Sequence, residues 1–490
     1  MRRFFYLTTS IAYVNAPPHI GFALESVQAD VYARYYKKLG KNVYFLTGTD
    51  EHGVKIVRAA EAANKMPKEF VDENSEKFKN LKSALNLSWD NFIRTSDRKI
   101  HWPVAQELWK RLKDNGDIYK RTYKGLYCVG HEAFVTQKDL VGGKCADHQK
   151  EPEVIEEENW FFKLSKYTDE IKRLITDGEL RIVPETRKNE ILSLLNEGLE
   201  DISFSRPSKD LKWGIPVPDD SSQTMYVWAD ALSNYISGLG GIKAWEEHSA
   251  DIHFIGKDIL RFHAAIWPAM LLSAGLPLPK LIFVHGHIMS GGQKMSKSLG
   301  NVIDPFELVK KYGVDAVRYF LLREIPSDGD GDFSYEKFED RYNGDLANGL
   351  GNLVARVAAI GEKLGEIKIE QSFFDRLFSS GGGSASGGKK DPYEKLFNDF
   401  KLDEVLEKIW EEIHVLDRRI NEEKPWSEKD GAILKKEIAE YGKKIINIAD
   451  ALYPFMSETS EKIKEHFSLS GGILKIKKGV NLFPRLDKVI

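Results

Sequence analysis

The sequence predicts an α/β protein in which a parallel sheet is divided by a small inserted domain and followed by a helical bundle. Three observations support this prediction. Strand-like and helix-like segments alternate near the N-terminus and again after residue 250, which is typical of a parallel sheet. Residues 116–210 interrupt this alternation with short strand-like segments, an acidic run and both cysteines. Beyond about residue 345 the chain is amphipathic with a helical period almost throughout.

Local patterning predicts the N-terminal elements. An apolar run at residues 4–9 predicts a buried strand, and a proline-rich turn then leads into a helix that Gly40 ends. The apolar positions of this helix recur at helical spacing: Leu24, Val27, Val31, Tyr35 and Leu39. Residues 42–46 predict the next strand, which runs into a polar tip at residues 47–53. This order of strand, helix and strand implies that the two strands are parallel.

The same sheet resumes late in the chain. Strands predicted near residues 252–255 and 281–284 flank a helix that begins at Asp258 and ends near Ala274. The predicted domains are the first half of the sheet domain (1–115), the insertion (116–210), the second half (211–290), a loop and connecting region (291–345) and the helical domain (346–490). Within the helical domain, residues 379–390 are rich in glycine and serine and predict a flexible linker, a composition also typical of an engineered loop.

Length and composition exclude several classes of protein. A chain of 490 residues, 42% of them hydrophobic, can bury several cores. No apolar stretch approaches the roughly 20 residues that span a bilayer, and the N-terminus lacks a signal-peptide pattern, so we expect a cytoplasmic protein without membrane contact. Two cysteines exclude a disulfide framework and leave at most one bridge or one metal site. With a net charge of -3, any RNA binding must use local basic faces.

Two short motifs are suited to phosphate binding. Residues 18–22 (Pro-His-Ile-Gly-Phe) stand at a predicted helix start, where Gly21 lets a phosphate approach unpaired N–H groups and His19 can donate to it. Residues 294–298 (Lys-Met-Ser-Lys-Ser) form a hydrophilic loop whose lysines, Lys294 and Lys297, can close over pyrophosphate. Each motif alone also fits a plain turn or a solvated loop. The pair predicts that both ends of one triphosphate are gripped.

Two cysteine–histidine pairs in the insertion predict a zinc site. Cys128 with His131, and Cys145 with His148, are both spaced as Cys-x-x-His. Thiolate and imidazole suit a tetrahedral zinc ion, and four protein ligands make a closed site, which is structural rather than catalytic. The alternatives are buried cysteines beside surface histidines, or a former metal site that is now a hydrogen-bonded knuckle.

Five segments together give the chain a family resemblance. Residues 19–22 (His-Ile-Gly-Phe) and 294–298 resemble the two hallmark motifs of the class I aminoacyl-tRNA synthetases. Residues 47–53 (Thr-Gly-Thr-Asp-Glu-His-Gly), 226–231 (Tyr-Val-Trp-Ala-Asp-Ala) and 254–258 (Phe-Ile-Gly-Lys-Asp) narrow the similarity to the methionyl-tRNA synthetases. The resemblance covers nearly the whole chain and implies a Rossmann-type catalytic domain split by a zinc-knuckle insertion and followed by an all-α helix-bundle anticodon-binding domain. Phe22 departs from the family, which usually has a second histidine there.

The resemblance also implies site residues. In the methionine pocket, Asp50 would pair with the α-ammonium and aromatic walls would contact the thioether. That pocket would consist of Ile11, Tyr13, Asp50, Trp228, Ala231, Tyr235, Ile259 and His263. The ATP-binding residues would be His19, Gly21, Phe22, Asp258, Lys294 and Lys297, and the catalytic residues His19, Lys294, Lys297 and Arg206. Asn352 and Arg356, four residues apart on one helix face, and Trp426 would bind the anticodon; by pattern alone they form a solvated face and a packing aromatic.

The implied reaction joins ATP and L-methionine into methionyl adenylate, with release of pyrophosphate, and then transfers methionine to the 3'-terminal adenosine of elongator and initiator tRNA(Met). Mg²⁺ would accompany ATP, and we expect a monomer. Three alternatives stay open: a small nucleotidyltransferase, a synthetase for leucine, isoleucine, valine or cysteine, and a tRNA-binding protein without catalysis. The helical domain argues against the first, the short insertion against a synthetase with a large editing domain, and the pair of phosphate motifs against the third.

Overall fold

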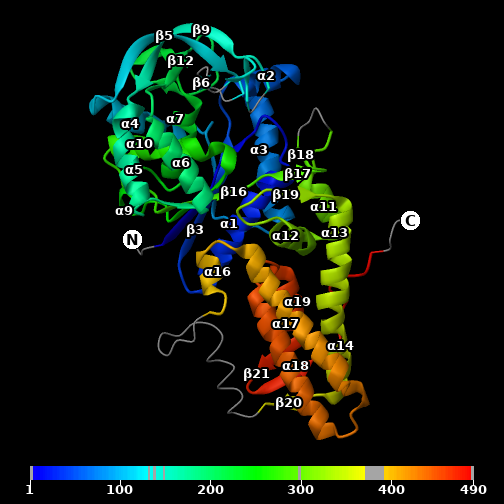
Figure 1. The fold of residues 1–490 in the computed structure, drawn as a ribbon. Coiled ribbons are helices and arrows are strands. Elements are labelled where there is room, and N and C mark those ends of the chain that lie inside the picture. Colours follow the sequence, from blue (N-terminus) through cyan, green and yellow to red (C-terminus); the bar gives the residue numbers. More distant parts are fainter. Residues whose placement is uncertain are drawn as a thin grey trace. The chain divides into compact units, whose positions relative to one another are not determined.

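The computed structural model describes residues 4–130, 133–135, 140–146, 149–295, 300–369 and 391–486. Two compact units make up the chain, and each is assembled from separate stretches of sequence. The first, here called the sheet unit, comprises Met1–Pro18, Val43–Ser83 and Ser88–His285. The second, here called the helical unit, comprises His19–Asn42, Ala84–Leu87 and Gly286–Ile490. Figure 1 labels the helices and strands of both units where there is room.

A parallel sheet forms the centre of the sheet unit, as the sequence predicts. Its strand order is β10, β16, β15, β1, β3, β2, with β4 beside β3, and all of these pairs are parallel. The strands are β1 (Phe5–Thr9), β2 (Ala12–Tyr13), β3 (Val43–Asp50), β4 (Asn91–Arg94), β10 (Arg181–Val183), β15 (Ile252–Gly256) and β16 (Leu281–His285). β3 continues past the predicted end at Leu46, because threonines suit a strand and Gly48 leaves room for Ile93 of β4.

Helices complete the sheet unit. They are α2 (Val54–Ala62), α3 (Pro67–Ala84), α4 (His101–Asp114), α5 (Thr168–Thr176), α6 (Glu185–Glu197), α7 (Val227–Leu232), α8 (Asn234–Ser237), α9 (Ile242–Glu247) and α10 (Trp267–Ser273). The helix predicted from Asp258 is instead a 3₁₀ turn (Lys257–Ile259) and a π-helical turn (Phe262–Ile266) that lead into α10. Such π turns are frequent at functional sites, and this one contains His263.

The predicted insertion contributes a smaller antiparallel sheet with strand order β11, β9, β5, β6. Its strands are β5 (Ile118–Cys128), β6 (Ala133–Val135), β9 (Glu153–Phe162) and β11 (Ile202–Ser203). Two further small sheets lie near these strands in the sequence. They are the hairpin of β7 (Leu140–Val141) and β8 (Lys144–Cys145) and the sheet of β12 (Ser205–Pro207), β13 (Pro216–Val217) and β14 (Asp220–Met225). Although β10 lies within residues 116–210, it pairs with β16 in the central sheet. The insertion is therefore not one uninterrupted domain.

The helical unit begins with α1 (Ile20–Lys38). After residue 286 come a small sheet of β17 (Ile288–Ser290), β18 (Gln293–Lys294) and β19 (Gly331–Phe333), then helices α11 (Pro305–Tyr312), α12 (Val314–Arg323), α13 (Tyr335–Arg341), the π-helix Tyr342–Gly351 and α14 (Asn352–Gly361). The rest comprises α16 (Glu394–Asn398), α17 (Leu402–Glu423), α18 (Gly431–Leu452), α19 (Ser457–His466) and a sheet of β20 (Ile367–Lys368), β21 (Phe467–Ser470) and β22 (Ile473–Ile476). That last sheet was not predicted. The predicted linker at residues 379–390 lies outside the described residues.

A buried arginine joins distant parts of the helical unit. Arg318 of α12 is fully buried and pairs with Asp30 of α1, with 2.8 Å between Nη2 and Oδ2. Its guanidinium also donates to three backbone carbonyl oxygens, those of Leu85 at 3.0 Å, Pro454 at 3.0 Å and Phe455 at 2.7 Å. One side chain thus holds together four stretches that are far apart in sequence.

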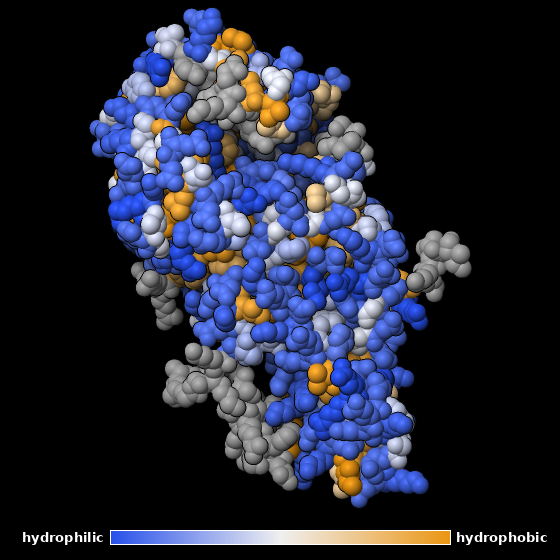
Figure 2. Space-filling view, in the orientation of Figure 1, coloured by the Kyte–Doolittle hydropathy of each residue, from blue (hydrophilic) through white to orange (hydrophobic). Residues whose placement is uncertain are grey.

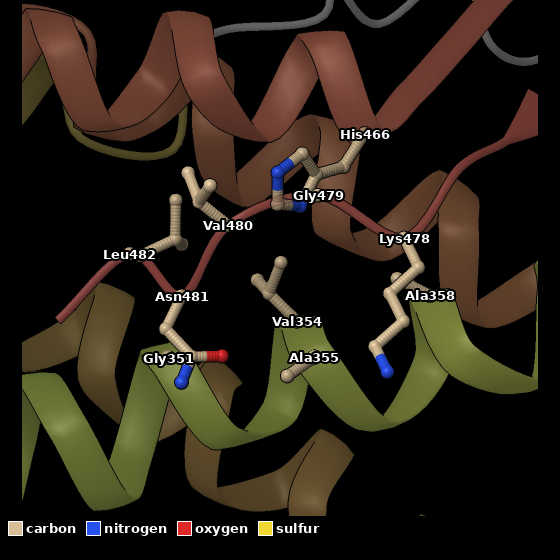
Figure 3. Close-up of a pocket in the computed structure, with 10 residues that line it drawn as sticks. All are labelled: Gly351, Val354, Ala355, Ala358, His466, Lys478, Gly479, Val480, Asn481 and Leu482. Carbon is tan, nitrogen blue, oxygen red and sulfur yellow. The ribbon is translucent and has the colours of Figure 1, made fainter. Parts of the chain in front are cut away.

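A small cavity lies between α14 and the C-terminal segment of the helical unit. Figure 3 shows Val354, Ala355 and Ala358 of α14 facing residues 478–482, with the His466 imidazole beside Gly479. A side chain at position 479 would collide with that imidazole, so glycine is required there. The face in Figure 2 is mostly hydrophilic with small apolar patches. Within the described ranges, no helix has the length and apolar character needed to cross a membrane.

Candidate active site

The first phosphate motif forms the N-terminus of α1. His19 is the N-cap residue, and its Nδ1 accepts a hydrogen bond from the Gly21 backbone N–H at 3.1 Å. This bond leaves the proton of the neutral imidazole on Nε2, which can donate to an anion. A Cβ atom at Gly21 would lie 2.9 Å from Cε1 and 3.0 Å from Nδ1 of His19, so glycine is needed for this arrangement.

The structure brings the second motif to the same place. Lys294 ends a hairpin whose turn, Gly291 and Gly292, has positive φ angles that suit glycine. Met295 Cε lies 3.8 Å from the position of a Cβ at Gly21, and the Ile20 backbone N–H donates to the Ile303 carbonyl at 3.0 Å. The two motifs therefore converge within the helical unit. Lys297 lies outside the described residues.

The convergence gives the helix start a positive environment. Although His19 is exposed as a residue, partial burial of its imidazole lowers the pKa, and the charges of His287 and Lys294 lower it further. His19 is therefore neutral at pH 7 and acts as a hydrogen-bond donor rather than a cation. Phe22, half-buried in the first turn of α1, supplies no polar group where a second histidine is usual in the family.

In the sheet unit, Tyr13 and Asp50 are adjacent at the carboxyl ends of their strands. They are register partners in β2 and β3, and the Val14 backbone N–H donates to the Asp50 carbonyl at 3.1 Å. Asp50 is only 8% exposed, which makes its carboxylate a strong site for a small cation such as an α-ammonium group. The ends of parallel strands are the usual ligand-binding edge of such sheets.

A cluster of aromatic side chains surrounds His263. Trp228 stacks on Phe262 with 3.8 Å between ring centroids, and it meets the His263 ring edge-on at 6.1 Å. Tyr235 Oη lies 2.7 Å from His263 Nε2, while His263 Nδ1 lies 3.0 Å from the Ile259 carbonyl. The Nδ1–H group donates to that carbonyl, so Nε2 accepts from Tyr235. Burial lowers the pKa of His263 to about 4, which keeps it neutral.

The other predicted pocket residues lie in the same unit. Ala231 is buried in α7, and Ile11 and Ile259 are half-buried and packed against the core that also contacts Tyr13 and Trp228. Asp258 is exposed in the 3₁₀ turn before Ile259. Sequence reasoning missed Phe262, whose stacking on Trp228 is not visible in a linear pattern; its place beside His263 was the available signal.

Arg206 lies in a buried ion pair. It is 7% exposed in β12, and its Nε and Nη2 donate to the two carboxylate oxygens of Glu157 at 3.0 and 2.8 Å. Its guanidinium also lies 4.0 Å from the centroid of the Tyr127 ring. These contacts join β12 to β9 and β5, and the catalytic role of Arg206 stays a prediction.

Half of the predicted zinc ligands are described. Cys128 and Cys145 are both buried and belong to one small cluster with Val135, while His131 and His148 lie outside the described residues. The Gln149 backbone N–H donates to the Cys145 carbonyl at 2.8 Å. Two buried thiols in one cluster are compatible with the predicted zinc knuckle. Among the residues that the structure describes, no metal-binding group of three or more candidate side chains is present.

The three predicted RNA-binding residues lie on neighbouring elements of the helical unit. Arg356 of α14 donates to Asp417 at 2.8 Å and to Asn421 at 2.7 Å, both on α17. Its guanidinium lies 5.3 Å from the centroid of the Trp426 ring, and Trp426 is 54% exposed. Asn352 is exposed one helical turn before Arg356. An exposed indole beside an arginine is a suitable surface for stacking an unpaired base.

Comparisons with known proteins agree with this geometry. The family model described as "tRNA synthetases class I (M)" matches residues 5–151 and 135–358. The methionine--tRNA ligase of Thermotoga maritima is 42% identical over 515 residues, covering 99% of this chain and 80% of that protein. The corresponding ligase of Brucella suis is 41% identical over 481 residues, covering 94% of this chain and 91% of that protein.

Solved structures give the same result. Mycobacterium tuberculosis methionyl-tRNA synthetase in complex with methionyl-adenylate has a TM-score of 0.88 and 35% identity, covering 99% of this chain and 100% of that chain. Its apo form has a TM-score of 0.82 and 34% identity, covering 99% of this chain and 98% of that chain. The chain therefore belongs to the class I tRNA synthetases, in the methionine group that the family model describes.

Proposed function

We propose that this protein is a methionine–tRNA ligase. It activates L-methionine with ATP to give methionyl adenylate and pyrophosphate, and it then transfers methionine to the 3'-terminal adenosine of tRNA(Met). The observation that carries this proposal is the convergence of the α1 N-terminus and the lysine hairpin, in a chain related over its whole length to methionine--tRNA ligases. The monomeric state and the cytoplasmic location stay predictions.

Activation needs no nucleophilic side chain, because the methionine carboxylate is already ionised at neutral pH and attacks the α-phosphorus directly. The protein aligns the reactants and neutralises the charge that develops on the phosphates. His19 Nε2, the positive end of the α1 helix dipole and Lys294 are suited to this, and we assign Lys297 the same role. We assign Gly21 and Phe22 to the edge of the phosphate site and Asp258 to the nucleoside of ATP. Mg²⁺ accompanies ATP.

Methionine binding divides between a charged end and an apolar end. Asp50 pairs with the α-ammonium group, and Tyr13 lies beside it in the sheet. Trp228, Tyr235 and His263 supply an aromatic surface for the thioether, where sulfur–ring contacts contribute up to about 1.5 kcal/mol each. A neutral His263 avoids placing a charge against the apolar side chain.

The finer assignments concern zinc and RNA. One structural Zn²⁺ bound by Cys128, His131, Cys145 and His148 would hold the hairpin of the insertion. Metal analysis is expected to give one zinc per chain, and Cys145→Ser is expected to lose it; a zinc-free protein with an intact insertion would contradict the assignment. Asn352, Arg356 and Trp426 are assigned to the anticodon of both elongator and initiator tRNA(Met).

The decisive experiment is amino-acid-dependent ATP–pyrophosphate exchange, run with each of the twenty amino acids in the absence of tRNA. We expect exchange with methionine alone, because the carboxylate site accepts the α-ammonium group of any amino acid, while the aromatic surface suits a flexible, polarisable thioether. Exchange with another amino acid would assign a different synthetase. Silence with all twenty, in a protein that still binds tRNA, would indicate a binding protein without catalysis.

A further inference from the structure

A buried carboxylate bridges two buried histidines in the sheet unit. His52 Nδ1 donates to Asp230 Oδ2 at 2.6 Å, and His101 Nε2 donates to Asp230 Oδ1 at 2.7 Å. The three side chains are at most 2% exposed. His101 Nδ1 lies 2.8 Å from Ser237 Oγ, which extends the network to α8. A buried polar network of this kind fixes its members closely, because any misalignment leaves a buried charge without its partner.

The network joins the two segments that carry the proposed methionine contacts. His52 follows Asp50 by two residues, at the end of β3. Asp230 lies in α7 between Trp228 and Ala231. The bond between His52 and Asp230 therefore ties the segment assigned to the ammonium group to the segment assigned to the thioether.

The neighbour of His52 is held equally firmly. Glu51 accepts from Arg94 Nε at 2.7 Å and from Thr49 Oγ1 at 2.6 Å. Its carbonyl accepts from Trp213 Nε1 at 2.5 Å. The bonds of Glu51 and of His52 therefore restrict the backbone that follows Asp50. The bond from His52 to Asp230 connects this restricted segment to α7.

We propose that His52 and His101 are positioning residues that set the geometry of the methionine pocket through Asp230. This inference rests on the proposed function, since it assigns the network to methionine binding. Neither histidine needs to touch methionine; each acts by fixing α7 relative to the end of β3. Burial raises the pKa of Asp230, but the charges and hydrogen bonds of His52 and His101 outweigh it and hold the pKa below its usual value, so the carboxylate is ionised.

The two histidines use different ring nitrogens, which provides a sharp test. When asparagine replaces histidine, its amide nitrogen lies close to the former position of Nδ1. When glutamine replaces histidine, its amide nitrogen reaches the former position of Nε2. His52→Asn and His101→Gln should therefore keep the bond to Asp230, while His52→Gln and His101→Asn should lose it. We expect the first pair to bind methionine within about threefold of the parent protein and the second pair to bind about tenfold or more weakly.

The measurement is the Kd for radiolabelled L-methionine by equilibrium dialysis, with the KM for ATP and the Tm recorded for each variant. Ser273→Ala is the control, because it removes another buried hydrogen bond, 2.8 Å long, to Asp117. It should lower the Tm without changing the Kd. Equal effects of asparagine and glutamine at both positions, or a Kd that simply follows the Tm, would overturn the positioning role. Absence of methionine binding in the parent protein would instead overturn the proposed function.

Discussion

A single methyl group at Gly21 would disturb the candidate phosphate site. Because the added Cβ would lie 2.9 Å from His19 Cε1, the imidazole must turn away and release the Gly21 N–H. We expect Gly21→Ala to lower the rate of methionine-dependent ATP–pyrophosphate exchange by about tenfold to a hundredfold. Gly344→Ala, in the π-helix where nothing lies within 4 Å of the new Cβ, should leave exchange unchanged. Equal rates in both variants would contradict the role of His19.

His263 makes stability depend on pH. Its pKa is about 4 in the folded protein and near 6.5 in the unfolded chain, so between these values the unfolded state binds the extra proton. The free energy of unfolding should therefore fall as the pH is lowered from 6.5 towards 4. His263→Gln should make this pH dependence shallower, which urea unfolding at several pH values measures. Part of the dependence should persist, because burial also lowers the pKa of His253. Parallel curves for the two proteins would be the contrary result.

Single residues were predictable from sequence where a motif fixes the backbone around them. The helix start at His19 and Gly21 and the glycine turn before Lys294 are local structures, whereas the meeting of the two motifs was expected from the family resemblance. The environment of Arg206 was not predictable, since its partner Glu157 lies 49 residues away on another strand. The network of His52, His101 and Asp230 was missed for the same reason: its bonds span 129 and 178 residues.

At the scale of elements, the proposed anticodon surface forms where α14 contacts α17 and the turn that carries Trp426. Trp426→Ala should weaken aminoacylation of tRNA(Met), because loss of one stacked base contact costs about 1 to 3 kcal/mol, and should leave exchange without tRNA intact. The matched control is Val415→Ala, because Val415 is also exposed. Val415 lies two residues before Asp417, which places it on the opposite side of α17. Loss of exchange in Trp426→Ala would make Trp426 a packing residue.

Elements with strong periodicity were predicted well, and short ones were not. α1, β1, β15 and β16 appear where their apolar patterns place them, and the late strands return to the sheet of β1. β10 has three residues, too few for a pattern that assigns it to one sheet rather than another. The 3₁₀ and π turns before α10 share the periodicity of a regular helix closely enough that sequence alone does not separate them.

For the molecule as a whole, Arg318 is a side chain that joins four stretches of the helical unit that are far apart in sequence. Arg318→Met should lower the free energy of unfolding by about 3 to 5 kcal/mol, because three buried carbonyl groups lose their donor and the buried Asp30 loses one arginine partner, while Arg34 still donates to it. The comparison is Arg419→Met, whose arginine is one-third exposed and pairs with Glu423 and Glu440 in the same unit; its loss should cost less than about 1 kcal/mol. Urea unfolding followed by circular dichroism measures both, and similar losses would contradict the expectation.

The interleaving of the two units has a consequence for synthesis on the ribosome. α1 leaves the ribosome early, but Arg318 and the carbonyl of Phe455, to which it is joined in the folded protein, are made hundreds of residues later. At 5 to 20 residues per second, roughly 20 to 90 seconds separate the synthesis of Asp30 from that of Phe455. During that interval α1 lacks those native partners in the helical unit that follow residue 286, so the nascent chain needs a temporary shield there that a chain with contiguous domains would not.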